Sequence, residues 1–265
     1  AMWLSWHYRS RHESLIAFSN HYYYENRLHT FPSPDDRSPE LGVTFRHVEN
    51  GMYDKGGSRT NRVEATKVVD EIVRMLTASE NPDSIGVVTF NQAQQSLIED
   101  LLDQKRRERP DIEKFFTSEV PEPVFVKNLE NVQGDERDSI IFSVGYGPDQ
   151  TGKVGLNFGP LNQSGGERRL NVAITRARRK LVVFASLRSD QIDLRRTQAL
   201  GMKHFKVFLD YADRGPRAIA EAVEQSGTRD FDSGFEHAVW KELVQRGWEV
   251  DTQVGLLRRK LQEQG

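Results

Sequence analysis

The sequence predicts an α/β fold in which a mainly parallel sheet carries helices on both faces. Short runs rich in β-branched and aromatic residues alternate along the chain with longer segments whose apolar residues recur at helical spacing. The chain has 265 residues, of which 37% are hydrophobic, so it can bury the core of one sizeable domain. In such folds, ligands are expected at the carboxyl ends of the strands.

Five segments are predicted to form strands, because each is short and apolar and lies between turn-forming residues. They are Val43–Val48, Ile85–Phe90, Val124–Lys127, Ser139–Val144 and Leu181–Ala185.

Helices are predicted where apolar residues lie three and four positions apart. They cover Glu13–Tyr24, a segment that begins at Asn61, a segment capped by Asn91, and His204–Tyr211. Proline and glycine residues predict loops between these elements, and a run of charged residues predicts irregular structure. These segments are Thr30–Leu41, Met52–Asn61, Arg106–Pro121 and Gly145–Gly166.

The stretch Glu167–Leu181 is the one around which the rest of the chain is organised. Its apolar residues predict one helix with a single buried stripe. They are Leu170, Ile174, Ala177 and Leu181. Arg169, Arg176 and Lys180 would share another face, about a quarter turn from that stripe. Arginines at such a core edge can reach a polyphosphate on a facing surface. The alternative is a helix whose basic face is simply solvated.

The character of the chain changes after the last predicted strand. Ala212–Asp230 is polar and predicts a linker, within which a short helix stays open. Ser233–Arg246 predicts a helix with Ser233 as its cap and Glu236 three residues later. Trp248–Val254 is predicted to be a strand. We therefore expect one domain over residues 1–212 and a linker with an appended segment over residues 213–265.

Composition excludes several classes of protein and site. The net charge is −2, so any surface that binds nucleic acid must be a local one. The chain has no cysteine, which rules out disulfides, thiolate metal sites and a cysteine nucleophile and fits a cytoplasmic protein. No apolar run reaches the roughly 18–20 residues that cross a membrane, so we expect no membrane partner. The histidines show no spacing typical of metal ligands.

Four motifs give the chain a resemblance to a known family. R-R-L-N-V-A-I-T-R-A-R, at Arg168–Arg178, resembles motif VI of superfamily 1 helicases. Three more stretches resemble other motifs of these helicases and follow in the family's order. They are Trp6–His12, Gly86–Gln94 and Asn128–Phe142. The amino-acid sequence of these motifs is most similar to that of large bacterial helicases related to the RNA-decay helicase branch. The resemblance implies a second RecA-like domain, which contains motifs IV to VI.

The resemblance implies a set of residues that meet ATP. Arg9 and Arg176 match the two arginines that reach the γ-phosphate, where a guanidinium can neutralise charge during phosphoryl transfer. Gln133, Gly134 and Glu136 match the part of motif V that faces the ATP cleft, and Arg169 and Arg178 are weaker candidates there. From the residues alone, Arg9 could equally form a structural ion pair.

Residues that meet nucleic acid are implied in the same way. Thr89 and Asn91 follow a strand and precede a helix, where hydroxyl and N–H groups can bind phosphate oxygens. Asn128 and Asn131 lie in the part of motif V that faces single-stranded DNA or RNA in the family. The alternative for Thr89 and Asn91 is an ordinary helix cap.

The sequence lacks the phosphate-binding loop G-x-x-x-x-G-K-[ST] and an acidic motif for Mg²⁺. In the family these lie on an upstream RecA-like domain, which would therefore hold most of the ATP and Mg²⁺. We expect this chain to supply arginines to that domain, and to be inactive by itself.

The last segment resembles the start of a restriction-endonuclease-like domain, in which Glu236 matches a helix glutamate. The catalytic acids expected after Gly255 are replaced by Leu256–Lys260, and one carboxylate does not make a nuclease. Two other functions remain open from the sequence. One is a nucleic-acid-binding or interaction module without ATPase activity, and the other is part of a helicase–nuclease.

Overall fold

The computed structural model describes residues 6–30, 41–226, 246, 248–250 and 257–259. The contacts between residues divide the chain into two compact units, residues 1–219 and residues 220–265. The first unit contains the four helicase-like motifs, and it is described first.

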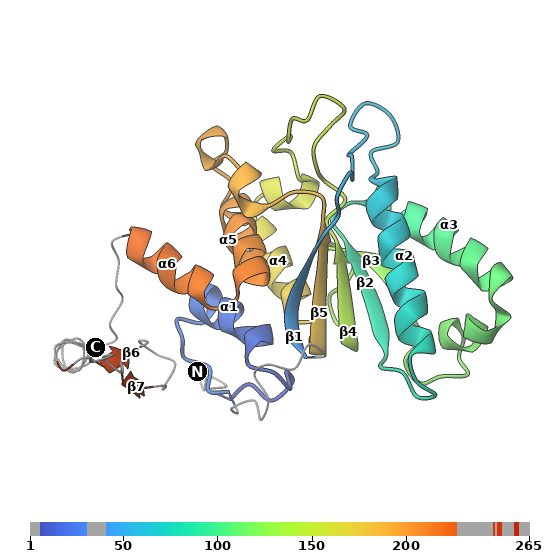
Figure 1. Cartoon of the computed structure of the whole chain (residues 1–265), viewed down its shortest axis with the longest axis horizontal. Helices are drawn as coiled ribbons and strands as arrows, with labels where there is room; N and C mark the ends of the chain where they lie inside the picture. Colours follow the sequence, from blue (N-terminus) through green and yellow to red (C-terminus); the bar gives the residue numbers. More distant parts are fainter. Residues whose placement is uncertain (1–5, 31–40, 227–245, 247, 251–256, 260–265) are drawn as a thin grey trace, which may run out of the picture. The chain divides into compact units, whose positions relative to one another are not determined.

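The first unit is built on one five-stranded sheet (Figure 1). Its strands are β1 (Gly42–His47), β2 (Ile85–Thr89), β3 (Phe125–Asn128), β4 (Arg137–Ser143) and β5 (Ala177–Ala185). They lie in the order β1-β5-β4-β2-β3, and every neighbouring pair is parallel. Each of the five predicted strands is present within a few residues of its expected bounds, which confirms the predicted fold class.

Helices cover both faces of this sheet. The α-helices are α1 (Ser14–Tyr23), α2 (Arg62–Thr77), α3 (Gln92–Glu108), α4 (Gly166–Ile174), α5 (Leu200–Arg214) and α6 (Arg217–Ser226). Short 3₁₀ helices are η1 (Pro110–Phe116), η2 (Gly159–Asn162), η3 (Ser189–Gln191) and η4 (Leu194–Arg196). Figure 1 shows α2 and α3 on one face of the sheet and α1, α4 and α5 on the other.

The two faces of the sheet belong to two separate hydrophobic clusters. Because side chains alternate along a strand, Ile140 and Phe142 of β4 point toward α1, α4 and α5, whereas Ile141 between them packs with α2 and α3. In β5, Leu181 packs in the same cluster as Ile140 and Phe142, and Val182 packs in the same cluster as Ile141. All five side chains are at most 1% exposed, as expected for a parallel sheet that is covered on both faces.

The predicted helix over Glu167–Leu181 is wrong in its second half. Helix α4 ends at Ile174, and β5 begins at Ala177. Ala177 and Leu181 are buried as predicted, but they are four residues apart, a spacing that puts them on one face of a strand as well as of a helix. Pairing with both β1 and β4 decides in favour of the strand. Arg169, Arg176 and Lys180 therefore do not share a helix face.

Three smaller differences concern the lengths of elements. Helix α3 continues to Glu108 and is followed by η1, where we predicted irregular structure, because Arg106 pairs with Asp103 and Glu113 and Ile112 is buried. Helix α5 is longer than predicted. The glycine-rich loop between β4 and α4 contains η2, which buries Leu161 against the core.

The second unit contains an antiparallel pair of short strands, β6 (Trp248–Val250) and β7 (Leu257–Arg259). β6 covers the start of the predicted strand Trp248–Val254. All of the predicted helix Ser233–Arg246 except Arg246 lies outside the described residues, and so does most of the predicted loop Thr30–Leu41. Glu236 is among the residues not described.

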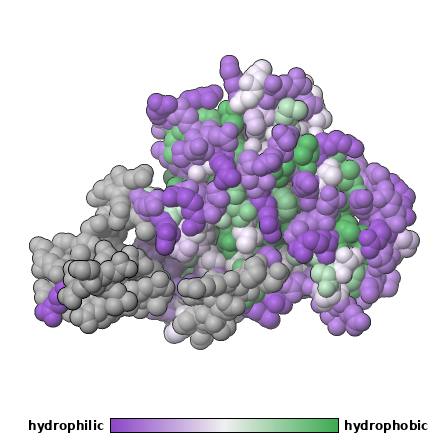
Figure 2. All heavy atoms as spheres, viewed as in Figure 1, coloured by the Kyte–Doolittle hydropathy of each residue, from purple (hydrophilic) through white to green (hydrophobic). Residues whose placement is uncertain are grey.

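Hydrophilic side chains cover most of the described surface in the view of Figure 2. Within the described part of the chain, no helix combines the length and apolar character that a bilayer crossing requires.

Candidate nucleotide-binding and nucleic-acid-binding surfaces

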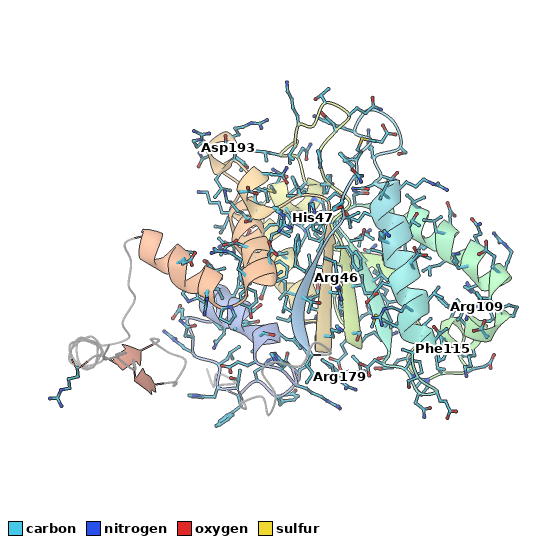
Figure 3. All side chains as sticks on the ribbon, in the orientation of Figure 1. Arg46, His47, Arg109, Phe115, Arg179 and Asp193 are labelled. Atoms are coloured by element: carbon cyan, nitrogen blue, oxygen red, sulfur yellow. The ribbon has the colours of Figure 1, made fainter. Side chains whose placement is uncertain are left out.

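The candidate residues lie at two opposite edges of the sheet. Arg176 and Glu136 directly precede β5 and β4, so they lie at the amino ends of two neighbouring strands. Thr89 and Asn128 end β2 and β3, which places them at the carboxyl edge. Figure 3 shows the two edges through Arg179, near the start of β5, and His47, at the end of β1. We expected the ligand-binding residues at the carboxyl ends of the strands. Thr89 and Asn128 lie there, whereas Glu136 and Arg176 lie at the amino ends.

Arg9 is held at the amino edge by contacts with two other residues, Glu136 and Thr175. Its Nε atom lies 2.8 Å from Oε2 of Glu136, and its Nη1 atom donates to the carbonyl oxygen of Thr175 at 3.4 Å. Nearby, the backbone N–H of Arg11 donates to the carbonyl oxygen of Arg178 at 2.7 Å. The side chain of Arg9 is 33% exposed, so part of its guanidinium remains open to solvent.

Arg176 lies beside the same residue, Thr175. Its Nε atom donates to the carbonyl oxygen of Val172 at 2.8 Å, and its Nη2 atom donates to Oγ1 of Thr175 at 3.2 Å. Burial lowers the pKa of Arg176, and the positive charge of Arg9 lowers it further. Two guanidinium groups therefore meet around one residue, and a bound anion would relieve their mutual repulsion.

Glu136 lies between two arginines. Oε2 pairs with Arg9 at 2.8 Å, and Oε1 lies 3.6 Å from Nη1 of Arg178. The loop that leads to it exposes Gln133 and Gly134. Gly134 has a φ of +94°, a conformation that glycine adopts without strain. The Q-G-x-E residues therefore share the amino edge with Arg9 and Arg176.

Arg178 is turned toward carboxylates, unlike Arg176. Its guanidinium forms a fork on Glu122, with Nη1 donating to Oε1 at 2.9 Å and Nη2 donating to Oε2, and Nε donates to Oδ1 of Asp138 at 3.0 Å. Nη2 also donates to Oγ of Ser84 at 3.1 Å. The hydrogen bonds to Glu122 are the main reason that the pKa of Arg178 is raised.

Arg169 is not brought into this group. It lies in the first turn and a half of α4, and its Nη1 atom donates to the carbonyl oxygen of Ser164 at 3.1 Å. The rest of α4 separates it from Arg176 along the chain. The prediction placed the two together because it continued the helix through Arg176.

At the carboxyl edge, two of the four predicted residues, Thr89 and Asn128, are buried, and Asn91 is partly buried. Thr89 is fully buried, and its hydroxyl donates to the carbonyl oxygen of Asn91 at 2.9 Å. Asn91 caps α3, since its Oδ1 accepts from the N–H of Gln94 at 2.8 Å. Asn128 is 5% exposed and donates to Oε1 of Gln92 at 2.7 Å. Only Asn131 is exposed among the four.

The buried position of Thr89 does not favour a direct contact with a phosphate, and that contact stays a prediction. A hydroxyl that is fully buried and already donates to a carbonyl cannot reach a phosphate unless the loop moves. Thr89 and Asn128 instead fix the start of α3, whose first residue, Gln92, is exposed. The ordinary cap considered for Asn91 is present.

Sequence reasoning missed a buried polar network behind this edge. Glu64 is fully buried on α2, where its Oε1 accepts from Oγ of Ser143 at 2.8 Å and from the N–H of Gly145 at 2.7 Å. Burial raises the pKa of Glu64 to about 7, and these hydrogen bonds partly oppose the rise. Asn61 and Gln94 complete the network, since Oε1 of Gln94 accepts from the N–H of Asn61 at 2.8 Å.

A signal for this network was present in the sequence. Asn61 and Glu64 have the spacing of a capping box, in which the acidic side chain turns back to the N–H of the cap residue. Here Gln94 takes that N–H, and Glu64 is free to point into the core. The network joins the starts of α2 and α3 to the ends of β4 and β5.

The AAA domain family matches residues 1–188 of the chain, a span that contains both edges described above. The chain belongs to this family. The chain is 34% identical over 239 residues to an uncharacterized ATP-dependent helicase of Mycoplasma genitalium, and the match covers 85% of this chain and 20% of that protein. A homologue of that helicase in Mycoplasma pneumoniae is 33% identical to this chain over 233 residues, and the match again covers 85% of this chain and 20% of that protein.

A more distant relative comes from Drosophila melanogaster. It is a homologue of regulator of nonsense transcripts 1 and is 26% identical to this chain over 186 residues. The match covers 66% of this chain and 14% of that protein. The chain thus spans about a fifth or less of the length of these curated relatives. Homology to ATP-dependent helicases agrees with the resemblance seen in the four motifs.

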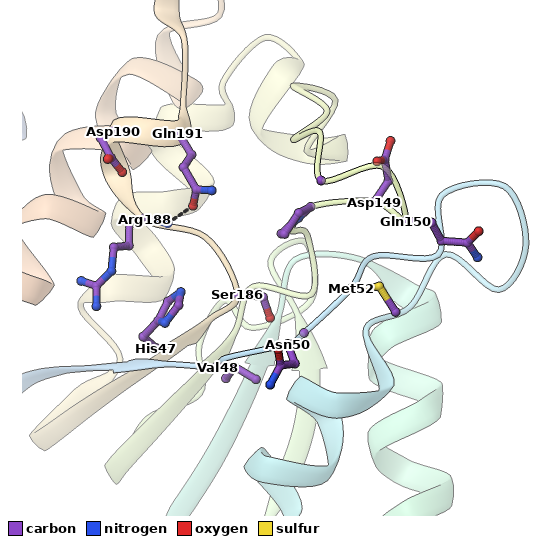
Figure 4. Close-up of a pocket in the computed structure, with 13 residues that line it drawn as sticks. His47, Val48, Asn50, Met52, Asp149, Gln150, Ser186, Arg188, Asp190 and Gln191 are labelled. Carbon is purple, nitrogen blue, oxygen red and sulfur yellow. Dashed lines mark hydrogen bonds between the residues drawn. The ribbon is translucent and has the colours of Figure 1, made fainter.

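A cavity, shown in close-up in Figure 4, contains neither Arg9 nor Arg176 in its lining. It has a volume of about 780 Å³ and opens between the end of β1 and the residues that follow β5, with His47, Ser186 and Arg188 among its lining. None of its lining residues is a candidate ATP-binding residue.

The amino edge carries the kind of charge that suits a polyphosphate. Arg9 and Arg176 provide positive charge at the amino edge, and the lowered pKa of Arg176 reflects an environment that favours a nearby anion. Among the described residues, no three histidines or carboxylates gather in a way that could hold Mg²⁺.

Proposed function

We propose that this chain is the second RecA-like motor domain of an ATP-dependent superfamily 1 helicase or translocase. In this proposal Arg9 and Arg176 are arginine fingers that approach the γ-phosphate of an ATP held on an upstream RecA-like domain. The observation that carries the proposal is the convergence of the two arginines on Thr175 at 3.4 and 3.2 Å.

The chemistry of phosphoryl transfer supports this assignment. Negative charge spreads over the γ-phosphate oxygens in the transition state, and arginines that are already positioned stabilise it without further reorganisation. Arg9 is oriented by Glu136, and Arg176 by a carbonyl and a hydroxyl, so both are held before ATP arrives. Mg²⁺ and most of the triphosphate would be bound by the upstream domain.

The carboxyl edge is the proposed surface for single-stranded DNA or RNA. Asn131 and Gln92 are exposed there, whereas Thr89, Asn91 and Asn128 would act by holding the loops and the start of α3 in place. The N-terminus of a helix favours phosphate because its first N–H groups have no partner within the helix. Closing and opening of the two RecA-like domains would then couple ATP hydrolysis to movement along one strand.

The experiment that tests the proposal is an ATPase assay on this chain alone and on a longer protein in which the phosphate-loop domain precedes it. We expect the longer protein to hydrolyse ATP faster when single-stranded DNA or RNA is added, and this chain alone to be inactive. Strong turnover by the chain alone would contradict the division of the site between two domains. An inactive longer protein that still binds the strand would favour a nucleic-acid-binding module.

A further inference from the structure

The segment Thr175–Arg178 contains two arginines whose surroundings differ in charge. The hydrogen bonds of Arg176 go to the carbonyl oxygen of Val172 and the hydroxyl of Thr175. Those of Arg178 go mainly to carboxylates, and its side chain is 21% exposed. Two residues that are close in sequence therefore offer an anion very different environments.

The donors of Arg178 are almost fully used. A guanidinium has five N–H groups, and those of Arg178 serve Glu122, Asp138 and Ser84 and approach Glu136. Oγ of Ser84 also donates to Oε2 of Glu122 at 2.7 Å, so this carboxylate has a second donor besides Arg178. A phosphate could bind Arg178 only by breaking a bidentate, charge-assisted contact, and the carboxylates of Glu122 and Asp138 would repel it.

The sheet itself turns Arg178 toward these carboxylates. Between the pairs Arg137–Ala177 and Ser139–Lys180, β5 has one residue more than β4, so Arg178 and Arg179 together lie opposite Asp138. An irregularity of this kind changes the direction of side chains at the end of a strand. Arg178 reaches Asp138 and Glu122, whereas Arg179 pairs with Asp83 at 2.8 Å.

Arg178 is connected to the proposed fingers through two contacts. Its Nη1 atom lies 3.6 Å from Oε1 of Glu136, whose other oxygen pairs with Arg9. Its carbonyl oxygen accepts the N–H of Arg11, two residues after Arg9. One residue thus holds both the carboxylate that orients Arg9 and the backbone that carries Arg9.

We infer that Arg178 is a positioning residue of the proposed ATP site, anchored by Glu122, and that it does not bind the nucleotide. The inference rests on the proposed function and changes the role that the sequence suggested for this arginine. It also assigns a role to Glu122 and Ser84, which no motif singled out.

The test compares Arg178→Met, Glu122→Gln and the double variant in the longer, strand-stimulated ATPase. If Arg178 acts through its position, either single change loosens the same anchor. We then expect kcat to fall about tenfold in each single variant while the KM for ATP stays within about twofold. The double variant should be no worse than the poorer single variant, because both changes remove one interaction.

Arg179→Met is the matched control, since Arg179 is the next residue of β5 and also forms an ion pair, with Asp83, away from Arg9. Its kcat should stay within about twofold of wild type. Arg178→Lys should recover only part of the activity, because an ammonium cannot reproduce the fork on Glu122.

Three outcomes would overturn the inference. The first is a KM for ATP that rises more than fivefold in Arg178→Met while Glu122→Gln behaves as wild type, which would make Arg178 a direct ligand. The second is an unchanged kcat in both single variants, which would leave a structural ion pair only. The third is a wild-type protein with no strand-stimulated hydrolysis, and this outcome would reject the proposed function itself.

Discussion

The carboxylate of Glu136 lies 2.8 Å from Nε of Arg9, and both side chains are about one third exposed. An ion pair this open to solvent contributes little to folding, about 0–1 kcal/mol. Its effect is to fix the direction of an arginine at the edge of the sheet. Glu136 and Arg9 come from motifs more than 120 residues apart, and the fold brings them together beside Arg176.

Glu136→Gln should therefore affect turnover more than stability. We expect the free energy of unfolding of this chain to change by less than about 1 kcal/mol, and ATP turnover by the longer protein to fall about tenfold. Glu130→Gln, an exposed residue of the same loop, is the control and should change neither value. A large loss of stability in Glu136→Gln would mean that the pair is structural.

Substitutions at Thr89 test whether this residue contributes to single-strand binding by direct contact or by holding the loop in place. Removing the buried hydroxyl in Thr89→Val should cost about 1 kcal/mol of stability and weaken binding of a labelled single strand, because the carbonyl of Asn91 loses its donor. Thr89→Ser keeps the hydroxyl and should retain the affinity within about twofold. Weaker binding in Thr89→Val without any loss of stability would instead indicate a direct contact.

Glu64 should make the stability of this chain depend on pH. Burial raises its pKa in the folded state to about 7, above its ordinary value of 4.5, so the folded state binds the proton more tightly. Stability is therefore greatest below pH 4.5 as far as this group is concerned, and it falls as the pH rises through 7, by at most about 3 kcal/mol.

Glu64→Gln removes this titration while keeping an acceptor for the N–H of Gly145. Chemical denaturation between pH 5 and 8 should show a smaller fall in stability for the variant than for wild type. Glu71→Gln is the control, because a hydrogen bond from Arg74 lowers the pKa of Glu71 below 4.5, so the fall in stability between pH 5 and 8 should match that of wild type. Parallel curves for wild type and Glu64→Gln would contradict the account.

Gly134 should tolerate alanine poorly even though space is available for a Cβ atom. Its φ of +94° is costly for any residue with a side chain, so Gly134→Ala should lose about 1 kcal/mol in urea denaturation. Gly56 is equally open, but no unusual φ is found there, and Gly56→Ala should be neutral or slightly stabilising. Equal effects of the two changes would show that the loop relaxes around Gly134.

Most of the fold could be predicted because buried parallel strands and amphipathic helices have clear patterns. The exception, the second half of the predicted arginine helix, arises at Ala177 and Leu181, whose spacing satisfies both periods. Local sequence could not decide between them, since the strand is selected by pairing with β1 and β4, segments that are distant along the chain.

The site was predictable at the level of motifs but not of contacts. The resemblance of the motifs predicted Arg9, Glu136 and Arg176 as site residues, and the three lie at one edge of the sheet. The role of Arg178 could not be read from sequence, because it depends on Glu122, which is 56 residues away along the chain. The burial of Thr89 was similarly hidden, since a strand-ending threonine looks the same whether its hydroxyl faces solvent or a carbonyl.

The measurement that tests the central claim most directly is the kcat of strand-stimulated ATP hydrolysis for Arg176→Ala in the longer protein. We expect kcat to fall at least about a hundredfold, as for the loss of a guanidinium that stabilises the transition state, with the fold of the chain retained. Arg176→Lys should recover little, because it lacks the planar fork. An unchanged kcat in Arg176→Ala would show that this arginine is not a finger, and would contradict the account.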